Sequence, residues 1–137
     1  MPPEGSKKRD RPILAFVVDD EPDLLNLVRI FLQDYDWDIE TFLSGADCLE
    51  RVKRKPLPDV IILDVMMPAL NGWETCKRLR EDPKTQTIPI AFLTAKVRKE
   101  DYEEGLRCGG DLYIEKSPNI GRDLDRVREY LGKRGLL

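Results

Sequence analysis

Four apolar stretches of this sequence are each followed by residues that can take part in metal or phosphate chemistry. Asp19 and Asp20 follow the first stretch, and Asp64 follows the second. Thr94 and Lys116 follow the third and the fourth. Because a carboxylate at the end of an apolar strand has no use in packing, Asp64 is either there by chance or a reactive group. Three acids, a hydroxyl group and an ammonium group together suit a divalent cation and a phosphoryl group.

Each of these residues also has an ordinary structural explanation. Asp19 and Thr94 can cap helices. Asp64 can form a turn, and Lys116 can be a solvated loop residue. The pattern is informative because the groups fall at the ends of different apolar strands. In a parallel sheet these ends share one edge, and open α/β folds place their ligand sites there.

Apolar stretches that favour strands alternate with segments whose apolar residues recur at helical spacing. Strands are predicted at about residues 12–18, 37–42, 59–63, 88–93 and 111–115. Five strand–helix units predict an α/β fold with a doubly wound, five-stranded parallel sheet and helices on both faces. The predicted inward faces include Leu24, Leu27 or Val28, Phe31 and Tyr35 in the first helix, Ala46, Leu49 and Val52 in the second, Tyr102 and Leu106 in the fourth, and Ile120, Leu124, Val127 and Leu131 in the fifth.

Length and composition limit the classes of protein that are possible. The 137 residues suit one domain. The net charge of -3 lacks the excess of basic residues that is typical of direct nucleic-acid binding. No apolar run reaches the roughly 18 residues of a membrane span, and the N-terminus lacks the apolar stretch of a signal peptide. We therefore expect a cytoplasmic protein without membrane contact. Residues 1–11 are predicted to be a flexible tail, residues 12–133 the folded domain and residues 134–137 a C-terminal tail.

Phosphoryl transfer to a carboxylate fits the reactive groups that remain. The sequence has no histidine, which excludes Ser-His-Asp and Cys-His triads. Its three cysteines lack metal-ligand spacing and are expected to be thiols in a reducing compartment. A carboxylate such as Asp64 can attack phosphorus and form an aspartyl phosphate. Mg²⁺ suits a site with Asp19 and Asp20, because crowded carboxylates repel one another unless a cation lies among them.

Several motifs resemble those of response-regulator receiver domains and cover about residues 12–133. Such domains have a flavodoxin-like sheet with strand order 2-1-3-4-5. The matching segments are Val17-Val18-Asp19-Asp20-Glu21, Asp64-Val65-Met66-Met67-Pro68 through Gly72, Leu93-Thr94-Ala95, Gly105-Leu106 with Gly109-Gly110-Asp111, and Tyr113 through Lys116.

The resemblance implies a signalling domain that catalyses only its own phosphorylation and dephosphorylation. Asp64 would accept a phosphoryl group from a histidine of a sensor kinase or of a histidine phosphotransfer protein. Mg²⁺ would bind Asp20, Asp64 and the backbone carbonyl of Met66 directly, and Asp19 through water.

The resemblance also implies how the phosphoryl group is held and read. Lys116 would contact the phosphate, and Thr94 and Tyr113 would form a coupled switch. The fourth helix, fifth strand and fifth helix would present the face that binds an unknown downstream protein.

One departure from the family pattern lies after the predicted fifth strand. The family has Lys-Pro with a cis bond, whereas this sequence has Lys116-Ser117-Pro118. A cis bond before a residue other than proline costs about 2.5–4 kcal/mol, so the Lys116–Ser117 bond is predicted to be trans.

Two alternative functions stay open from the sequence. One is a phosphorylation-independent scaffold, although such degenerate receivers usually lose an acid or the lysine. The other is a haloacid-dehalogenase-like phosphatase. That enzyme needs Asp-x-Asp after its first strand, whereas Asp19 and Asp20 are adjacent here.

Overall fold

The computed structural model describes residues 11–137, so the predicted tail of residues 1–11 lies outside the described residues except for Arg11. In this part of the chain five strands alternate with five helices. The strands are β1 (Leu14–Val18), β2 (Asp38–Phe42), β3 (Val60–Leu63), β4 (Ile90–Thr94) and β5 (Leu112–Glu115). The helices are α1 (Pro22–Gln33), α2 (Gly45–Arg51), α3 (Gly72–Glu81), α4 (Lys99–Arg107) and α5 (Ile120–Lys133).

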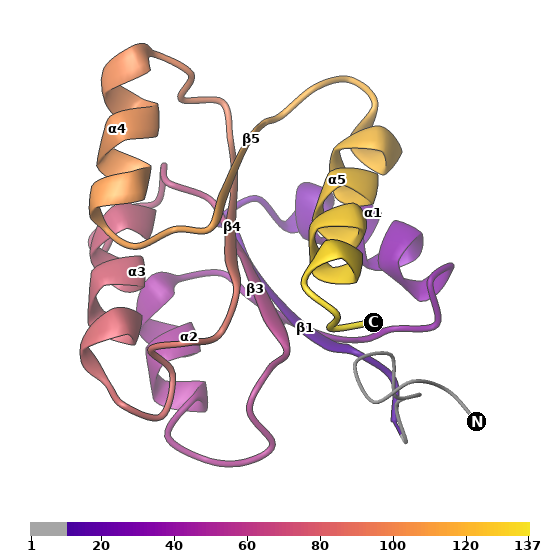
Figure 1. Cartoon of the computed structure of the whole chain (residues 1–137). Helices are drawn as coiled ribbons and strands as arrows, with labels where there is room; N and C mark the ends of the chain where they lie inside the picture. Colours follow the sequence, from indigo (N-terminus) through magenta and orange to yellow (C-terminus); the bar gives the residue numbers. More distant parts are fainter. Residues whose placement is uncertain (1–10) are drawn as a thin grey trace.

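The strands form one parallel sheet in the order β2-β1-β3-β4-β5. Helices α2, α3 and α4 lie on one side of the sheet, and α1 and α5 lie on the other (Figure 1). The loops that follow β4 and β5 lie at the same end of the molecule, at the top of Figure 1. The predicted doubly wound fold and the strand order are therefore confirmed. Among residues 11–137, no helix has the length and apolar character needed to cross a membrane.

The three central strands form because apolar side chains cover both of their faces. All residues of β1, β3 and β4 are buried. Alternate side chains point to opposite faces, so Val17 and Ile62 join the core beneath α1 and α5. Phe16 and Ile61 join the second core, beneath α2 and α3. Polar residues that follow these strands therefore emerge at the edge of the sheet, outside both cores.

The predicted apolar faces are correct for α5 and α1 and wrong in part for α2. Ile120, Leu124, Val127 and Leu131 are all buried in α5. In α1, Val28 is buried and Leu24, Phe31 and Tyr35 pack against the core, whereas Leu27, the alternative to Val28, is exposed. In α2, Ala46 is exposed, whereas Leu49 packs against the second core and Val52, directly after the helix, is buried. The buried residues are Leu25, Val28 and Leu32 in α1 and Gly45, Cys48 and Arg51 in α2.

The predicted inward face of α4 is wrong. Tyr102 is 36% exposed and Leu106 is 73% exposed, whereas Asp101 and Gly105 are buried. The carboxylate of Asp101 accepts a backbone N–H at the start of the helix at 3.0 Å. A Cβ atom at Gly105 would lie 2.6 Å from the ring of Tyr113. The helix can therefore approach the sheet closely only with glycine at this position.

The loop between β5 and α5 is fixed by side chains near the start of α5. Asp123 is buried, and one of its oxygens accepts the backbone N–H of Ser117 at 2.8 Å. Asn119 caps α5 by accepting the N–H of Arg122 at 3.0 Å. The cis peptide bond within residues 11–137 is Lys55–Pro56, so the Lys116–Ser117 bond is trans, as predicted.

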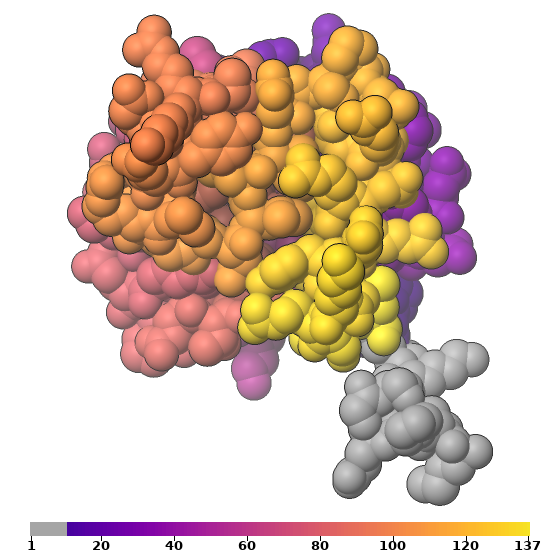
Figure 2. Space-filling view, turned by 45° about the horizontal axis from the view of Figure 1, so that its top comes forward, coloured from indigo at the N-terminus to yellow at the C-terminus, as the bar shows by residue number. Residues whose placement is uncertain are grey.

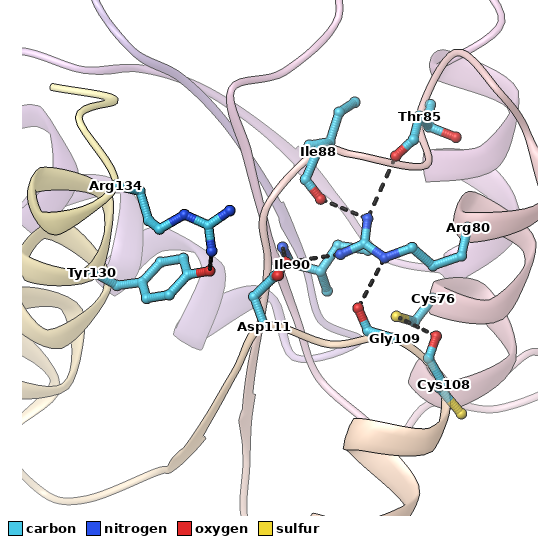
Figure 3. A network of polar contacts seen from close by, with 10 residues as sticks. All are labelled: Cys76, Arg80, Thr85, Ile88, Ile90, Cys108, Gly109, Asp111, Tyr130 and Arg134. Carbon is cyan, nitrogen blue, oxygen red and sulfur yellow. Dashed lines mark hydrogen bonds and ion pairs between the residues drawn. The ribbon is translucent and has the colours of Figure 1, made fainter. Parts of the chain in front are cut away.

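Arg80 connects α3 to the amino ends of β4 and β5 (Figure 3). Its Nε donates to the carbonyl of Gly109 at 2.8 Å, and its Nη1 donates to the carbonyl of Ile88 at 2.7 Å. Its Nη2 lies 2.8 Å from Oδ2 of Asp111, which also accepts the N–H of Ile90 at 2.8 Å. This network stabilises the end of the sheet opposite to the loops that carry the predicted site.

Candidate functional site

The structure brings the predicted site residues to the carboxyl ends of neighbouring strands. Asp19 follows β1, Asp64 follows β3, Thr94 ends β4 and Lys116 follows β5. Asp19, Asp64 and Thr94 are buried, whereas Asp20 is exposed. Acids that are 45 positions apart in the sequence (64 - 19) thus lie at one edge of the sheet because β1 and β3 are paired.

Lys116 joins the two buried carboxylates. Its Nζ lies 3.0 Å from Oδ2 of Asp19 and 3.0 Å from Oδ2 of Asp64. The exposed fractions of these side chains are 18% for Lys116, 5% for Asp19 and 3% for Asp64. Two carboxylates with one ammonium group leave this buried position with negative charge in excess when both acids are ionised.

The second oxygen of each carboxylate accepts a backbone N–H from the loop that follows. Glu21 N donates to Oδ1 of Asp19 at 2.9 Å, and Met66 N donates to Oδ1 of Asp64 at 3.2 Å. In both cases the donor lies two residues after the acid, which is the spacing of an Asx turn. Each carboxylate is therefore held between the loop on one side and Lys116 on the other.

Burial and mutual repulsion determine the acidity of these groups. Burial raises the pKa of Asp19 from 3.8 to about 6, and the negative charge of Asp64 also raises it. Hydrogen bonds from the backbone of Glu21 and from Lys116 lower this pKa but do not cancel the effect of burial. Burial also disfavours the charged form of Lys116, but the hydrogen bonds to Asp19 and Asp64 raise the pKa of this lysine. An additional cation beside the acids would stabilise their charged forms.

The carboxylates of Asp19, Asp20 and Glu21 form a compact group. One oxygen from each residue lies within 4.8 Å of the others. Asp64 is outside this group, although Lys116 contacts both it and Asp19. Carboxylate oxygens are suitable ligands for Mg²⁺, and the exposed positions of Asp20 and Glu21 leave room for the water molecules that Mg²⁺ retains. The donor set therefore fits a hydrated Mg²⁺ ion.

The sequence prediction did not include Glu21 as a candidate ligand. The sequence does indicate this possibility, because Glu21 directly follows Asp19 and Asp20. A carboxylate at this position extends the acidic group toward the start of α1.

The turn after Asp64 is fixed by the close approach of α3. A Cβ atom at Gly72 would lie 2.1 Å from the carbonyl oxygen of Asp64. The N–H of Gly72 donates to the carbonyl of Val65 at 3.0 Å. Met66, whose carbonyl is a predicted metal ligand, lies in this turn and is 53% exposed. Glycine at position 72 is thus required for α3 to begin directly against the turn.

Thr94 and Tyr113 are both bonded to the main chain of Lys96. The N–H of Lys96 donates to Oγ1 of Thr94 at 3.2 Å. The hydroxyl of Tyr113 donates to the carbonyl of Lys96 at 2.8 Å. The two residues predicted to form a switch are therefore connected through one residue that the sequence prediction did not assign to the switch.

Comparison with known proteins identifies relatives over most of the chain. The family model for the response regulator receiver domain matches residues 15–128. The phosphate regulon transcriptional regulatory protein PhoB of Rhizobium meliloti is 36% identical over 115 residues, which are 84% of this chain and 50% of that protein. An uncharacterized 14.6 kDa protein of Leptolyngbya boryana is 38% identical over 114 residues, which are 83% of this chain and 86% of that protein.

Solved structures give the same result. The chemotaxis protein CheY4 of Vibrio cholerae is similar with a TM-score of 0.80 and 29% identity, covering 87% of this chain and 98% of that one. The chain spans about half the length of the first curated relatives, 53%, 50% and 47%. Because the family model matches most of the sequence and the fold agrees, this chain belongs to the response regulator receiver domain family.

Proposed function

We propose that this chain is the phosphoacceptor domain of a two-component phosphorelay and that Asp64 takes the phosphoryl group. The observation that supports this assignment is the position of Asp64, buried at the carboxyl end of β3 with one oxygen bonded to Lys116 and the other to the N–H of Met66. Response regulators work with sensor histidine kinases. The proposed donor is therefore a phosphohistidine on a kinase or on a histidine phosphotransfer protein.

In the proposed reaction a carboxylate oxygen of Asp64 attacks the phosphorus atom of the phosphohistidine. A P–O bond forms as the P–N bond breaks. The electron pair of the broken bond returns to the imidazole nitrogen, which takes up a proton. Lys116 neutralises a phosphoryl oxygen as a point charge. Thr94 accepts the N–H of Lys96 and can still donate its own hydroxyl proton to another phosphoryl oxygen.

Mg²⁺ supplies neutralisation of the phosphoryl charge when it is bound. Receiver domains generally bind this ion at the acidic cluster. We propose Asp20, Asp64 and the carbonyl of Met66 as direct ligands, with Asp19 acting through water. Glu21 is a further candidate ligand because it belongs to the compact carboxylate group.

The proposed output is a change in the face formed by α4, β5 and α5. Helices α4 (orange) and α5 (yellow) frame this face in Figure 2. The ring of Tyr113 in β5 lies 4.5 Å from the ring of Tyr102 on α4, measured between ring centres. A phosphoryl group on Asp64 would attract the hydroxyl of Thr94, and the main chain of Lys96 connects Thr94 to Tyr113. A local charge would thus bias the surface that a downstream protein binds.

Intact mass spectrometry after incubation with acetyl phosphate and MgCl₂ tests this function. The wild-type chain should gain the mass of one phosphoryl group, and hydroxylamine should remove it. The Asp64→Asn variant should gain none. The Asp38→Asn variant, which changes an exposed acid on β2, should behave like the wild type. Equal uptake by Asp64→Asn and the wild type would refute the assignment.

A further inference from the structure

Lys96 contacts more of the region around the switch than its place in an exposed loop suggests. We propose that Lys96 is a positioning residue whose side chain anchors the loop between β4 and α4 and so holds Thr94 and Tyr113 in their bonded arrangement. This proposal rests on the proposed switching function of Thr94 and Tyr113.

The main chain of Lys96 makes the two hydrogen bonds that connect it to the switch side chains. Its N–H reaches Thr94 and its carbonyl reaches Tyr113, at 3.2 Å and 2.8 Å. A displacement of this one residue therefore changes the surroundings of both switch side chains together.

The side chain of Lys96 holds the loop to the two helices that flank it. Its Nζ lies 5.3 Å from the centre of the Trp73 ring, at the start of α3. The same atom lies 3.8 Å from Oδ1 of Asp101, in the first turn of α4. The Nε1 of Trp73 is buried without a hydrogen-bond partner among the described residues, so packing and the cation hold this ring in place.

The loop has a second anchor at Arg98, whose backbone N–H donates to Oδ2 of Asp101 at 3.0 Å. Ala95, Val97 and Arg98 are exposed, whereas Thr94 before them is fully buried. Tyr113 is confined by its neighbours, because its ring packs against Tyr102 and there is no room for a side chain at Gly105. The hydroxyl of Tyr113 therefore keeps its partner only while the carbonyl of Lys96 stays in place.

Replacing Lys96 by Met removes the charge and keeps a long apolar side chain. The opening equilibrium of the loop should then increase by roughly two- to fivefold, the weight of a solvent-accessible cation–π contact. Trp73→Leu removes the aromatic ring of the same cation–π contact and should increase the opening equilibrium by a similar factor. Lys96→Arg retains a cation that can lie over the ring and should behave like the wild type.

Amide hydrogen exchange at position 96, measured by NMR with correction for the intrinsic rate of each residue type, reports this opening. The measurement uses the intact chain without phosphoryl donor or metal, so its result does not depend on phosphorylation of Asp64. Lys99→Met, which removes an exposed lysine at the start of α4, is the matched control and should leave the exchange unchanged. Exchange in Lys96→Met equal to that of the wild type, or equal to that of Lys99→Met, would overturn the proposal.

A titration with beryllofluoride and MgCl₂ connects the loop to the switch. Ring signals of Tyr113 in the wild type should respond, and Lys96→Met should show a smaller response at the same occupancy, with Lys96→Arg restoring it. An identical response in Lys96→Met and the wild type would refute the positioning role. A wild type that does not bind beryllofluoride would instead count against the proposed function.

Discussion

Lys116→Met tests whether the ammonium group offsets the charge of two buried acids. Nζ of Lys116 lies 3.0 Å from each of two carboxylates whose side chains are at most 5% exposed. Hydrogen bonds to charged groups contribute about 1.5–3 kcal/mol each, and breaking a buried ion pair costs about 3–5 kcal/mol. The loss is limited because Asp19, with a pKa of about 6, can become neutral by taking up a proton. Protonation of this carboxylate costs about 1.4 kcal/mol for each unit by which the pH exceeds its pKa. We therefore expect a loss of about 3 kcal/mol at pH 7, a large part of a typical stability of about 5–15 kcal/mol.

Urea denaturation followed by circular dichroism, in buffer with a chelator, measures this loss. Lys133→Met, at an exposed position on α5, is the control and should change the unfolding free energy by less than about 0.5 kcal/mol. Adding Asp64→Asn to Lys116→Met should recover part of the loss, because one unpaired charge is then removed. A Lys116→Met variant within about 1 kcal/mol of the wild type would show that solvent or protonation already neutralises the acids, and the electrostatic reasoning would fail.

Three further changes probe other parts of the account. Because burial raises the pKa of Asp19, the stabilising contribution of this residue is present at low pH and is lost as the pH rises through about 6. Urea titrations with chelator should measure this as the unfolding free energy of the wild type minus that of Asp19→Asn. We expect this difference to be about 2 kcal/mol higher at pH 4 than at pH 7. Arg80→Met breaks three charged hydrogen bonds to the strand ends and should cost about 2–3 kcal/mol in the same assay, whereas Arg78→Met at an exposed position of α3 should cost less than about 0.5 kcal/mol. Asp123→Ala removes the hydrogen bond that holds the loop carrying Lys116. Mass spectrometry of samples quenched at successive times should show that phosphoryl uptake from acetyl phosphate is slowed by roughly tenfold. An unchanged rate would show that other contacts hold the loop.

The strands and the positions of the acids that follow them were predictable from one feature, the point at which each apolar run ends. Where the apolar run of a parallel strand stops, the chain leaves the core at a known edge of the sheet, so Asp19, Asp64, Thr94 and Lys116 were placed there from the sequence. The contact of Lys116 with both acids was not predictable, since it depends on the pairing of β1 with β3 and on side-chain reach.

The error in the predicted face of α4 arises from the close approach of its backbone to the sheet. Spacing predicted Leu106 inward, but α4 packs through Gly105 against Tyr113, and a glycine contributes nothing to a hydrophobic pattern. The contacts of Lys96 and Asp123 were likewise missed, because charged residues in loops and first helical turns carry no periodic signal. Such residues become visible only when the tertiary contacts are known.

Chemical trapping of the phosphorylated residue tests the central claim most directly. Borohydride reduces an aspartyl phosphate and leaves a stable mark on the residue that carried it. After treatment with acetyl phosphate and MgCl₂, followed by borohydride and peptide sequencing by mass spectrometry, the mark should be at Asp64 and at no other acid. A mark at Asp19 or Asp20, or no mark in a chain that has gained phosphoryl mass, would contradict the assignment of Asp64 as the phosphoacceptor.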